Sequence, residues 1–430
     1  MAWYINRRLK KNMTDLHHLI EKFGNPDALI DHWDASSHRF AIWGFEESFS
    51  INAKGVAQLN GEYSDLPPLE FWQKTLDKWK ADSHILSAVG FISYDFKYLL
   101  FPHISFNKPI SNQPLFWFGK PKKVIPYNLI EAEPKESSPF FHLKKDIPSP
   151  HEYQKSITTI KTALANGDSY QINFTQPKQY GLSGDPFEIY SSMRESVHPH
   201  YGMYLNLEDF QILSFSPERF FHTSDDTIES FPMKGTRPRS NDIVIDERLA
   251  EELFQSEKDR AEHLMIVDLI RNDIGKVCEF GSVNVDSLYD IQSFETVHQM
   301  VSRVYGRLHK SVKEIDIFKA LFPGGSITGA PKEKSMEIID SLEGYQRGVY
   351  TGSLGFIQPN GDMDFNIAIR TMTIQNNMGI YPVGGGIVWD SDSLEEWQEA
   401  QQKGAILKPF CHEFQPQSLN YKNENLISNH

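Results

Sequence analysis

Cysteine is scarce in this chain, and its scarcity excludes several classes of protein. Only two of the 430 residues are cysteines, Cys278 and Cys411, and they are far apart in the sequence. A disulfide-stabilised secreted scaffold and a cysteine-ligated zinc site are therefore excluded. Because such cysteine usage fits a reducing compartment, we expect a cytoplasmic protein.

Positive charge and long apolar runs are also in short supply. The chain has 43 Lys and Arg against 57 Asp and Glu, a formal net charge of -14. This balance suits neither a phosphate backbone nor an anionic membrane surface, so we expect no nucleic-acid and no membrane partner. The start, MAWYINRRLKKNMTDLHHLI, has basic residues but no apolar block behind them, and no run approaches membrane-spanning length. We therefore expect a soluble protein without a secretory signal.

The composition that remains is that of a folded globular protein. Hydrophobic residues make up 40% of the chain and charged residues 23%, which is too apolar for disorder. Residues 131–150, EAEPKESSPFFHLKKDIPSP, are rich in Pro, Ser and charge, as is typical of a connection. We predict an N-terminal region over residues 1–145, a catalytic region over residues 146–412 and a frayed polar tail over residues 413–430.

The catalytic region alternates helical patterns with hairpins. Residues 149–168 have a Ser-Pro start, apolar positions at helical spacing and a Gly stop, and residues 171–180 then alternate as a strand does. Further on, Asn360-Gly361 is a hairpin turn signal between two strand-like segments. Consecutive hairpins imply an antiparallel sheet with helices on its outer faces, so the predicted fold class is α+β.

Two helical patterns carry carboxylates in notable places. Residues 264–270 are apolar nearly all round, which predicts a buried helix with Glu262 at its entrance. In a later helix, Ser393 and Glu396 have capping-box spacing, which gives Glu396 a structural role. Glu399 has no such role and shares a face with Lys403.

The spacing leaves two interpretations of these carboxylates open. A solvated ion pair between Glu399 and Lys403 is the commoner arrangement on a single helix. If Glu262 and Glu399 converge in the fold, however, they can hold magnesium, which takes one or two protein carboxylates together with waters and ligand oxygens.

Residues 362–374, DMDFNIAIRTMTI, alternate as one strand and place Arg370 on a face with small neighbours. Such an arginine can receive a carboxylate, although a solvent-facing arginine is commoner. The next strand pattern contains Gly384, Gly385 and Gly386, whose backbone amides can approach an anion closely.

The order and wording of these segments resemble the chorismate-utilising enzymes, which include anthranilate, aminodeoxychorismate, isochorismate and salicylate synthases. The resemblance runs from about Ile147 to Pro409 and implies an antiparallel β-sandwich core with helices on its outer faces. It rests on these motifs: GDSYQINFTQ, SFSPERF, PMKGTRPR, DRAEHLMIVDLIRND, PGGSITGAPK, YTGSLGFI, FNIAIRT and GGGIVWDSD.

The resemblance assigns ligands to a metal and to a dicarboxylate substrate. Glu262 and Glu399 match the glutamates that hold Mg²⁺ on the ring carboxylate of chorismate. Arg370 and Lys403 match carboxylate-binding cations, and the amides around Gly385, with Gly384 and Gly386, match contacts to the enolpyruvyl carboxylate.

The resemblance also assigns an acid and pocket-lining residues. Glu218 matches the general acid that protonates the departing 4-hydroxyl, and such an acid needs a raised pKa. His298 matches a catalytic histidine near that hydroxyl, although a lone strand histidine is more often structural. Thr328, Thr351 and Gly352 match pocket-lining positions.

Two further positions distinguish members of the family. Isochorismate and salicylate synthases have a water-activating lysine where this chain has Gln171, which cannot deprotonate water, so hydration at C2 is disfavoured. Before Gly-Thr in FPMKGTRPRS, most relatives have alanine, whereas aminodeoxychorismate synthases have a lysine, here Lys234. We predict a stiff turn between Pro232 and Pro238, and the resemblance implies that Lys234 is a nucleophile and Thr236 a substrate contact.

The resemblance thus implies an aminodeoxychorismate synthase component I, which makes 4-amino-4-deoxychorismate for para-aminobenzoate and folate synthesis. Neither cysteine lies in a glutaminase-like elbow, so we expect a separate glutamine amidotransferase subunit to supply ammonia. Anthranilate synthase component I, which releases pyruvate, is the alternative within the family. A non-catalytic chorismate-binding regulatory subunit is the alternative of another class. Whether Lys234 acts covalently or electrostatically stays open at this point, as do tryptophan binding and oligomeric state.

Overall fold

The computed structural model describes residues 14–33, 39–107, 113–128, 140–208, 210–294 and 297–412. The predicted polar tail over 413–430 and residues 131–139 of the predicted connection lie outside the described residues. The helices are α2 (Leu16–Phe23), α3 (Pro68–Asp82), α4 (Lys97–Leu100), α5 (Pro150–Ala165), α6 (Pro186–Val197), α7 (Ile243–Gln255), α8 (Glu257–Gly275), α9 (Glu314–Leu321), α10 (Lys332–Leu342) and α11 (Ser393–Lys403), with short 3-10 helices at Tyr94–Phe96, Gly325–Ile327 and Ala405–Phe410.

The strands outnumber the helices and are mostly short. They are β1 (Thr14–Asp15), β2 (Ala28–Asp31), β3 (Arg39–Ile51), β4 (Ala57–Leu59), β5 (Glu62–Tyr63), β6 (Ala88–Ile92), β7 (Phe116–Asn128), β8 (Phe141–Lys145), β9 (Gln171–Leu182), β10 (Tyr201–Asn206), β11 (Gln211–Ser216), β12 (Arg219–Ser224), β13 (Thr227–Ser230), β14 (Met233–Pro238), β15 (Asn284–Ser293), β16 (Val297–Arg307), β17 (Gly329–Ala330), β18 (Ser353–Ile357), β19 (Met363–Asn366), β20 (Thr371–Gln375) and β21 (Met378–Ile387).

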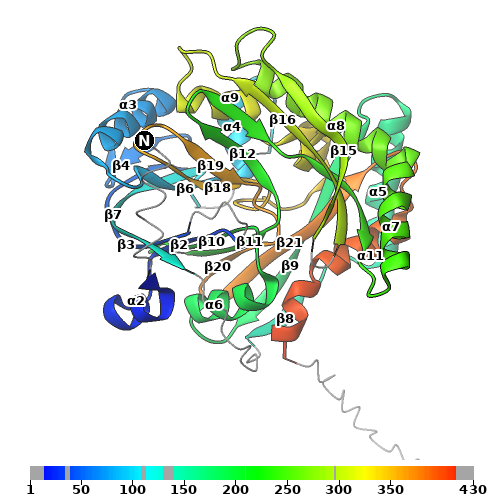
Figure 1. The fold of residues 1–430 in the computed structure, drawn as a ribbon, viewed down its shortest axis with the longest axis horizontal. Coiled ribbons are helices and arrows are strands. Elements are labelled where there is room, and N and C mark those ends of the chain that lie inside the picture. Colours follow the sequence, from blue (N-terminus) through cyan, green and yellow to red (C-terminus); the bar gives the residue numbers. More distant parts are fainter. Residues whose placement is uncertain are drawn as a thin grey trace, which may run out of the picture.

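The strands form an antiparallel network that folds over on itself. One run of pairings goes from β9 through β21, β20, β11, β10 and β2 to β3, and another continues through β7, β6, β18, β19 and β12. Among the described strand pairs, only β1 with β7 is parallel. The two runs lie in layers, one above the other (Figure 1). The predicted α+β class, with an antiparallel sandwich and helices outside it, is confirmed.

Apolar side chains fill the space between the layers and beneath the helices. A central cluster joins β2, β3, β10 and β11 of one layer to β6 and β18 of the other. Separate clusters pack α3 and α9 on one outer face and α2 and α6 on the other. A fourth cluster packs α5 and α10 against β9. Burial of these apolar faces is the main driving force for this arrangement.

Strands on both sides of residue 145 pair with each other. β2 pairs with β10, and β6 pairs with β18. The division at residue 145 stays a prediction, since the sheet itself runs across it.

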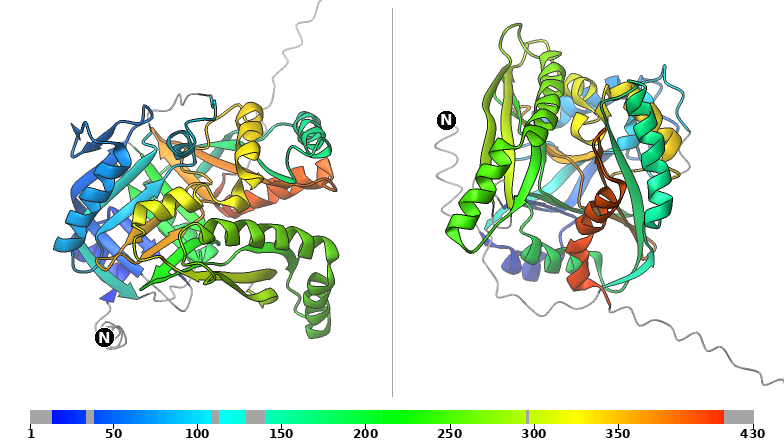
Figure 2. Two further views of the ribbon diagram at one scale, coloured as in Figure 1. Left: turned by 90° about the horizontal axis from the view of Figure 1, so that it is seen from above. Right: turned by 90° about the vertical axis from the view of Figure 1, so that its right-hand side faces the viewer.

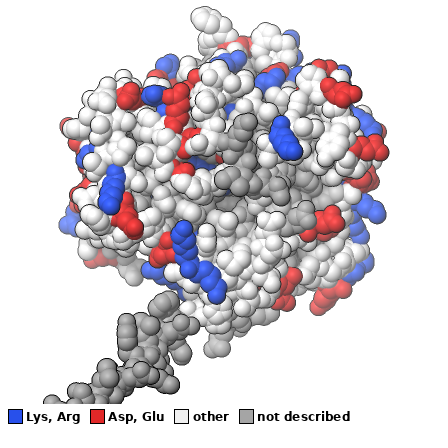
Figure 3. All heavy atoms as spheres, turned by 180° about the vertical axis from the view of Figure 1, so that it is seen from behind, with Lys and Arg blue, Asp and Glu red and all other residues white. Residues whose placement is uncertain are grey.

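In the described part of the chain, no helix combines the length and apolar character that a bilayer span requires. On the face drawn in Figure 3, acidic and basic side chains are interspersed.

The local helix signals were largely correct, with one exception at a helix start. α5 begins at Pro150, and Ser149 and Glu152 form a complete capping box, as the Ser-Pro start predicts. The capping box predicted for Ser393 and Glu396 is wrong. Asp392 caps α11 instead, because its carboxylate accepts from the next two free backbone amides.

The prediction that residues 264–270 form a helix buried all round is also wrong. α8 is helical there, but 47% of Leu264 is exposed, and only one face of the helix is covered. The helix also begins earlier, at Glu257, so Glu262 lies in its second turn. With β14–β16, α7 and α8 form the green to yellow-green arm at the side of the molecule in Figure 2.

Two segments differ from their predicted backbone. Residues 362–374 are two strands, β19 and β20, because the chain bends at Arg370, whose φ is +49°. The motif around Lys234 is not a turn but strand β14, paired with β16. A bulge at Gly235, where φ is +68°, shifts the register there. Such bulges re-aim neighbouring side chains, and here the affected neighbour is Lys234.

Candidate active site

The candidate site lies around the glycine triplet of β21, residues 384–386. A Cβ atom built on Gly386 would lie 3.0 Å from Cδ and Nε2 of Gln171 and 3.3 Å from Nζ of Lys234. Three segments that are distant in sequence, β9, β14 and β21, therefore meet at this point. A Cβ atom at position 386 would be in tight contact with the Gln171 carboxamide, so glycine leaves more space between Gln171 and Lys234.

The neighbouring glycine faces α11. A Cβ atom on Gly385 would lie 3.4 Å from Oε2 of Glu396, 3.4 Å from Nζ of Lys403 and 3.5 Å from Oε1 of Glu399. Lys403 donates from Nζ to the carbonyl oxygen of Gly384 at 2.8 Å and pairs with Glu399 at 2.7 Å. The Glu399–Lys403 pair predicted from helical spacing is therefore present, and it borders the site.

Lys234 is half-buried, and four charged side chains act on it. Burial lowers the pKa of its ammonium group, Lys403 also lowers it, and Glu262, Glu218 and Glu399 raise it less than burial lowers it. The net effect is a lowered pKa, which is the direction of shift that a nucleophilic amine requires.

Glu218 has the electrostatics of a general acid. It precedes β12, and Ser326 donates a hydrogen bond from Oγ to its Oε1 at 3.2 Å. Burial raises the pKa of this carboxyl to about 7, although Lys234, Ser326 and Lys403 act in the opposite direction. Near neutral pH, a large fraction of Glu218 therefore carries a proton that it can donate.

This raised pKa has a measurable consequence for stability. The folded pKa of about 7 exceeds the ordinary value of 4.5, so ionisation of Glu218 costs the folded state. The cost is absent below the ordinary pKa and complete above the folded pKa, where it reaches on the order of 3 kcal/mol at about 1.4 kcal/mol per pKa unit. We expect Glu218→Gln to raise the melting temperature at pH 8 and to leave it nearly unchanged at pH 4, below the ordinary pKa.

Differential scanning calorimetry of parent and variant at both pH values measures this difference. Glu208→Gln is the control, because Glu208 is exposed and its replacement changes stability little at either pH. A Glu218→Gln protein that melts at the parent temperature at pH 8 contradicts the raised pKa.

Glu262 and Glu399 lie close enough for the charge of Glu399 to affect the pKa of Glu262. Burial raises the pKa of Glu262, and Glu399 contributes in the same direction while Lys234 opposes it. For Glu399, burial acts to raise the pKa, but the ion pair with Lys403, together with the charges of Lys234 and Lys258, outweighs burial and lowers it. Among the described residues, no three His, Cys, Asp or Glu side chains group as metal ligands. Two mutually repelling carboxylates fit magnesium, which commonly uses only one or two from the protein.

Three predicted pocket residues, Gln171, Thr328 and Thr351, are fully buried. The two threonines use their hydroxyl groups in hydrogen bonds within the chain, whereas Gln171 does not use its carboxamide. Thr328 donates to the carbonyl oxygen of Gly324 at 2.8 Å, and Thr351 donates to that of Tyr350 at 2.6 Å. The carboxamide of Gln171 has no hydrogen-bond partner on either polar atom among the described residues. Its free donors and acceptor are therefore available to a ligand beside Lys234.

Gly352 is buried where backbone segments meet. A Cβ atom there would lie 2.1 Å from the carbonyl oxygen of Ile92, so the position accepts only glycine. This close approach joins the segment after Tyr350 to the end of β6. Its contact with substrate stays a prediction.

The remaining predicted residues are less closely tied to this cluster. His298 is buried, and its ring nitrogens contact Ser293 Oγ at 2.8 Å and Asp246 Oδ1 at 2.9 Å, which accounts for it structurally. Thr236 and Arg370 are exposed. No interaction of the described residues links His298 to Lys234 or Glu218, and the roles of these three residues stay predictions.

Three neighbours of the cluster were not singled out from the sequence as site residues. Glu396 accepts from Ser391 Oγ at 2.6 Å and also reaches Gly385, so it borders the site. Ser326 contacts Glu218. His263 is buried, and burial, together with Lys234, lowers its pKa to about 4. Its position beside Glu262 in the sequence was the only available signal.

Comparison with known proteins gives relatives for this arrangement. A model of the family described as chorismate binding enzyme matches residues 31–409. Aminodeoxychorismate synthase component 1 of Salmonella typhimurium is 43% identical over 259 residues, which cover 60% of this chain but only 57% of that protein. Anthranilate synthase component 1 of Methanothermobacter thermautotrophicus is 35% identical over 404 residues, which cover 87% of this chain and 86% of that protein.

A solved structure agrees with these sequence matches. Anthranilate synthase component I of Streptococcus pneumoniae superposes with a TM-score of 0.76 at 28% identity, covering 87% of this chain and 93% of that one. The shared fold extends over both the N-terminal and the catalytic regions. Since the family model spans most of the sequence and the relatives agree with it, this chain belongs to the chorismate-binding enzyme family.

Proposed function

We propose that this chain converts chorismate and ammonia into 4-amino-4-deoxychorismate, with Lys234 as the nucleophile. The observation that carries the proposal is the position of the Lys234 amine beside Gln171 and Gly386, with a lowered pKa. An amine of this kind in a pocket of acids and cations is suited to covalent catalysis. Aminodeoxychorismate synthases of Salmonella typhimurium and Bacillus subtilis, at 43% and 41% identity, support the assignment.

The first step forms one bond and breaks another. The Lys234 amine donates its electron pair to C2 of the ring, the ring double bonds shift, and the C4–O bond breaks. Glu218 gives its proton to the departing hydroxyl, which leaves as water. Lys234 is then joined to C2 and Glu218 is a carboxylate.

The second step returns the double bonds of the ring to their original positions. Ammonia adds at C4, the C2–N bond to Lys234 breaks, and a proton lost from the incoming nitrogen restores the acid form of Glu218. The sum is chorismate and ammonia giving aminodeoxychorismate and water. Gln171 can orient a reactant by hydrogen bonds, but it cannot activate water as a base, which disfavours C2 hydration.

Magnesium and two cations complete the proposed binding site. Glu262 and Glu399 would hold Mg²⁺, which neutralises the ring carboxylate and withdraws electrons from the diene when bound. Lys403 lies against the glycine triplet, where it can meet a substrate carboxylate together with backbone amides, and Arg370 is the proposed second cation. Local positive charge is needed because the chain as a whole is acidic and chorismate is a dianion.

Ammonia requires a source, since free ammonia is mostly protonated at neutral pH. Relatives named component 1 imply a second component, and we propose a separate glutaminase subunit for this chain.

A specific observation also favours a second candidate function, anthranilate synthesis, because the anthranilate synthase relative of Methanothermobacter matches a larger share of both chains. That activity would place the amino group at C2 and release pyruvate.

One experiment separates these activities. The purified chain is incubated with chorismate and Mg²⁺, with either an ammonium salt or glutamine, and the product mass and pyruvate are measured. We expect the mass of aminodeoxychorismate without pyruvate from ammonium, and no product from glutamine. Pyruvate release would identify an anthranilate synthase, no chorismate consumption would favour a regulatory subunit, and product from glutamine would contradict a separate glutaminase.

A further inference from the structure

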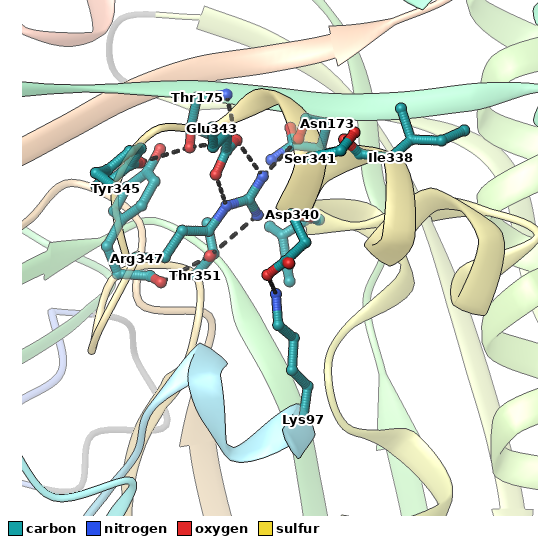
Figure 4. Close-up of polar contacts among 12 residues, drawn as sticks. Lys97, Asn173, Thr175, Ile338, Asp340, Ser341, Glu343, Tyr345, Arg347 and Thr351 are labelled. Carbon is teal, nitrogen blue, oxygen red and sulfur yellow. Dashed lines mark hydrogen bonds and ion pairs between the residues drawn. The ribbon is translucent and has the colours of Figure 1, made fainter. Parts of the chain in front are cut away.

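A buried ion pair lies behind the candidate site, next to the end of α10. Glu343 and Arg347 are only 7% and 4% exposed. Nε and Nη2 of Arg347 each donate to a different carboxylate oxygen of Glu343 at 2.7 Å, so the pair is bidentate (Figure 4). Neither residue has a role in the proposed reaction. An ion pair buried in this way is costly unless its remaining hydrogen-bonding capacity is used.

Arg347 uses all of that capacity. A guanidinium group has five N–H bonds, and two of them bind Glu343. The others are directed to the carbonyl oxygens of Asn173 at 2.6 Å and Ile327 at 2.9 Å, and to Thr351 Oγ1 at 3.3 Å. Five donors therefore have five acceptors, in the planar geometry that only arginine offers.

The three acceptors outside the pair come from separate segments that line the site. Asn173 lies on β9, two residues after Gln171. Ile327 ends the 3-10 helix Gly325–Ile327, directly before Thr328. Thr351 is one of the pocket-lining residues predicted from the sequence. The guanidinium group is thus bonded at once to the backbone of β9, to the Gly325–Ile327 segment and to Thr351.

Glu343 extends the same connection along β9. Its Oε1 accepts from the backbone N of Thr175 and from Thr175 Oγ1, both at 2.8 Å. Thr175 Oγ1 also contacts the hydroxyl of Tyr345 at 2.6 Å. Figure 4 shows these side chains converging on the ion pair. β9 is therefore held at two positions, Asn173 and Thr175, by the two members of one pair.

Side chains of the N-terminal region also pack against Arg347. The guanidinium carbon lies 4.5 Å from the ring centroid of Tyr94, and Lys97 Nζ lies 4.4 Å from the same centroid. Lys97 also pairs with Asp340 of α10 at 3.4 Å. Arg347 thus has little freedom to move, because an aromatic ring covers it and five acceptors surround it.

We propose that Arg347, paired with Glu343, is a positioning residue that sets Gln171, Thr328 and Thr351 relative to one another around the substrate. The inference rests on the proposed function, since it concerns the same pocket. Displacement of reacting groups by about 1 Å can cost about a hundredfold in rate, so a rigid connection behind the pocket has catalytic value.

The test compares Arg347→Lys with a matched pair elsewhere. Lysine keeps the charge but has only three donors, so it loses contacts to the lining segments. Arg194 and Asp31 form another buried bidentate pair, between α6 and β2, and Arg194→Lys is the control. At a temperature at which both variants are folded by circular dichroism, we expect kcat/KM for chorismate consumption to fall about a hundredfold in Arg347→Lys and less than about threefold in Arg194→Lys.

A double-mutant cycle distinguishes positioning from loss of stability. If Arg347 acts through Gln171, the effects of Arg347→Lys and Gln171→Ala on kcat/KM are not additive, whereas those of Arg194→Lys and Gln171→Ala are. Thr175→Val, which removes one hydroxyl bond to Glu343, is a milder variant that serves if Arg347→Lys does not fold, and we expect a smaller decrease with the same non-additivity.

The outcomes separate this inference from the proposed function. An active parent with additive effects in the cycle, or with equal losses in the Arg347 and Arg194 variants, overturns the positioning role alone. A parent chain that consumes no chorismate with Mg²⁺ and ammonium overturns the proposed function and the positioning role with it.

Discussion

Replacement of Lys234 by alanine is expected to lower the formation of aminodeoxychorismate by about a thousandfold or more, because it removes the nucleophile of the first step. The Lys234 amine and the Gln171 carboxamide both lie next to Gly386. The charges of Glu262, Glu218, Glu399 and Lys403 act on this amine. Steady-state rates with chorismate, Mg²⁺ and ammonium measure the loss. A second measurement, intact-protein mass spectrometry after mixing with chorismate without ammonia, should show an adduct of chorismate less water on the parent and none on the variant.

The control for this prediction is another lysine of intermediate burial. Lys120 on β7 is paired with Glu46 at 3.0 Å and is only 12% exposed, and we expect Lys120→Ala to keep the parent rate. A Lys234→Ala protein that forms product at the parent rate would remove the nucleophile proposal. A large loss of rate without an adduct on the parent would indicate that Lys234 acts through its charge.

Replacement of Glu262 by glutamine is expected to lower kcat/KM by about a hundredfold or more and to raise the Mg²⁺ concentration for half-maximal activity. The physical reason is that one of two carboxylate ligands becomes a neutral amide, which binds a hard cation more weakly. A second readout is the melting temperature, since an ion that binds the folded chain raises it. We expect Mg²⁺ to stabilise the parent and to stabilise Glu262→Gln much less.

Glu314→Gln is the matched control for the metal prediction. Glu314 is 8% exposed and pairs with Lys80 and Gln73 at the start of α9, remote from β21. It should keep the parent response to Mg²⁺ in both measurements. An unchanged Mg²⁺ response in Glu262→Gln would show that Glu262 is not a ligand.

Local signals in the sequence were reliable where near neighbours decide the backbone. The start of α5 was predicted from Ser149, Pro150 and Glu152, because a capping box involves only residues within one turn. The start of α11 was predicted wrongly, since Ser393 and Asp392 both offer capping oxygens and the sequence does not rank them. The break at Arg370 was missed for a related reason, because alternation continues across it while the backbone changes direction.

Some errors came from the tertiary partners of an element. The motif around Lys234 has prolines at both ends and reads as a turn, yet β16 supplies a hydrogen-bonding partner along its length and makes it a strand. The apolar run from Leu264 to Ile270 suggested burial on all sides, but the described residues leave Leu264 47% exposed. Propensity and periodicity describe what a segment can do, and packing selects among the options.

The sequence alone determined the family, through long motifs in a constant order, and with it the identity of the candidate acid, amine and carboxylates. It also pointed to the glycine triplet at residues 384–386 as a part of the candidate site. The tertiary structure decided the rest: that Glu262 and Glu399 influence each other, that burial raises the pKa of Glu218 to about 7, and that Arg347 joins three lining segments. The reason is that pKa values and ion pairs depend on burial and on charges brought together from distant parts of the chain, which spacing along the sequence does not encode.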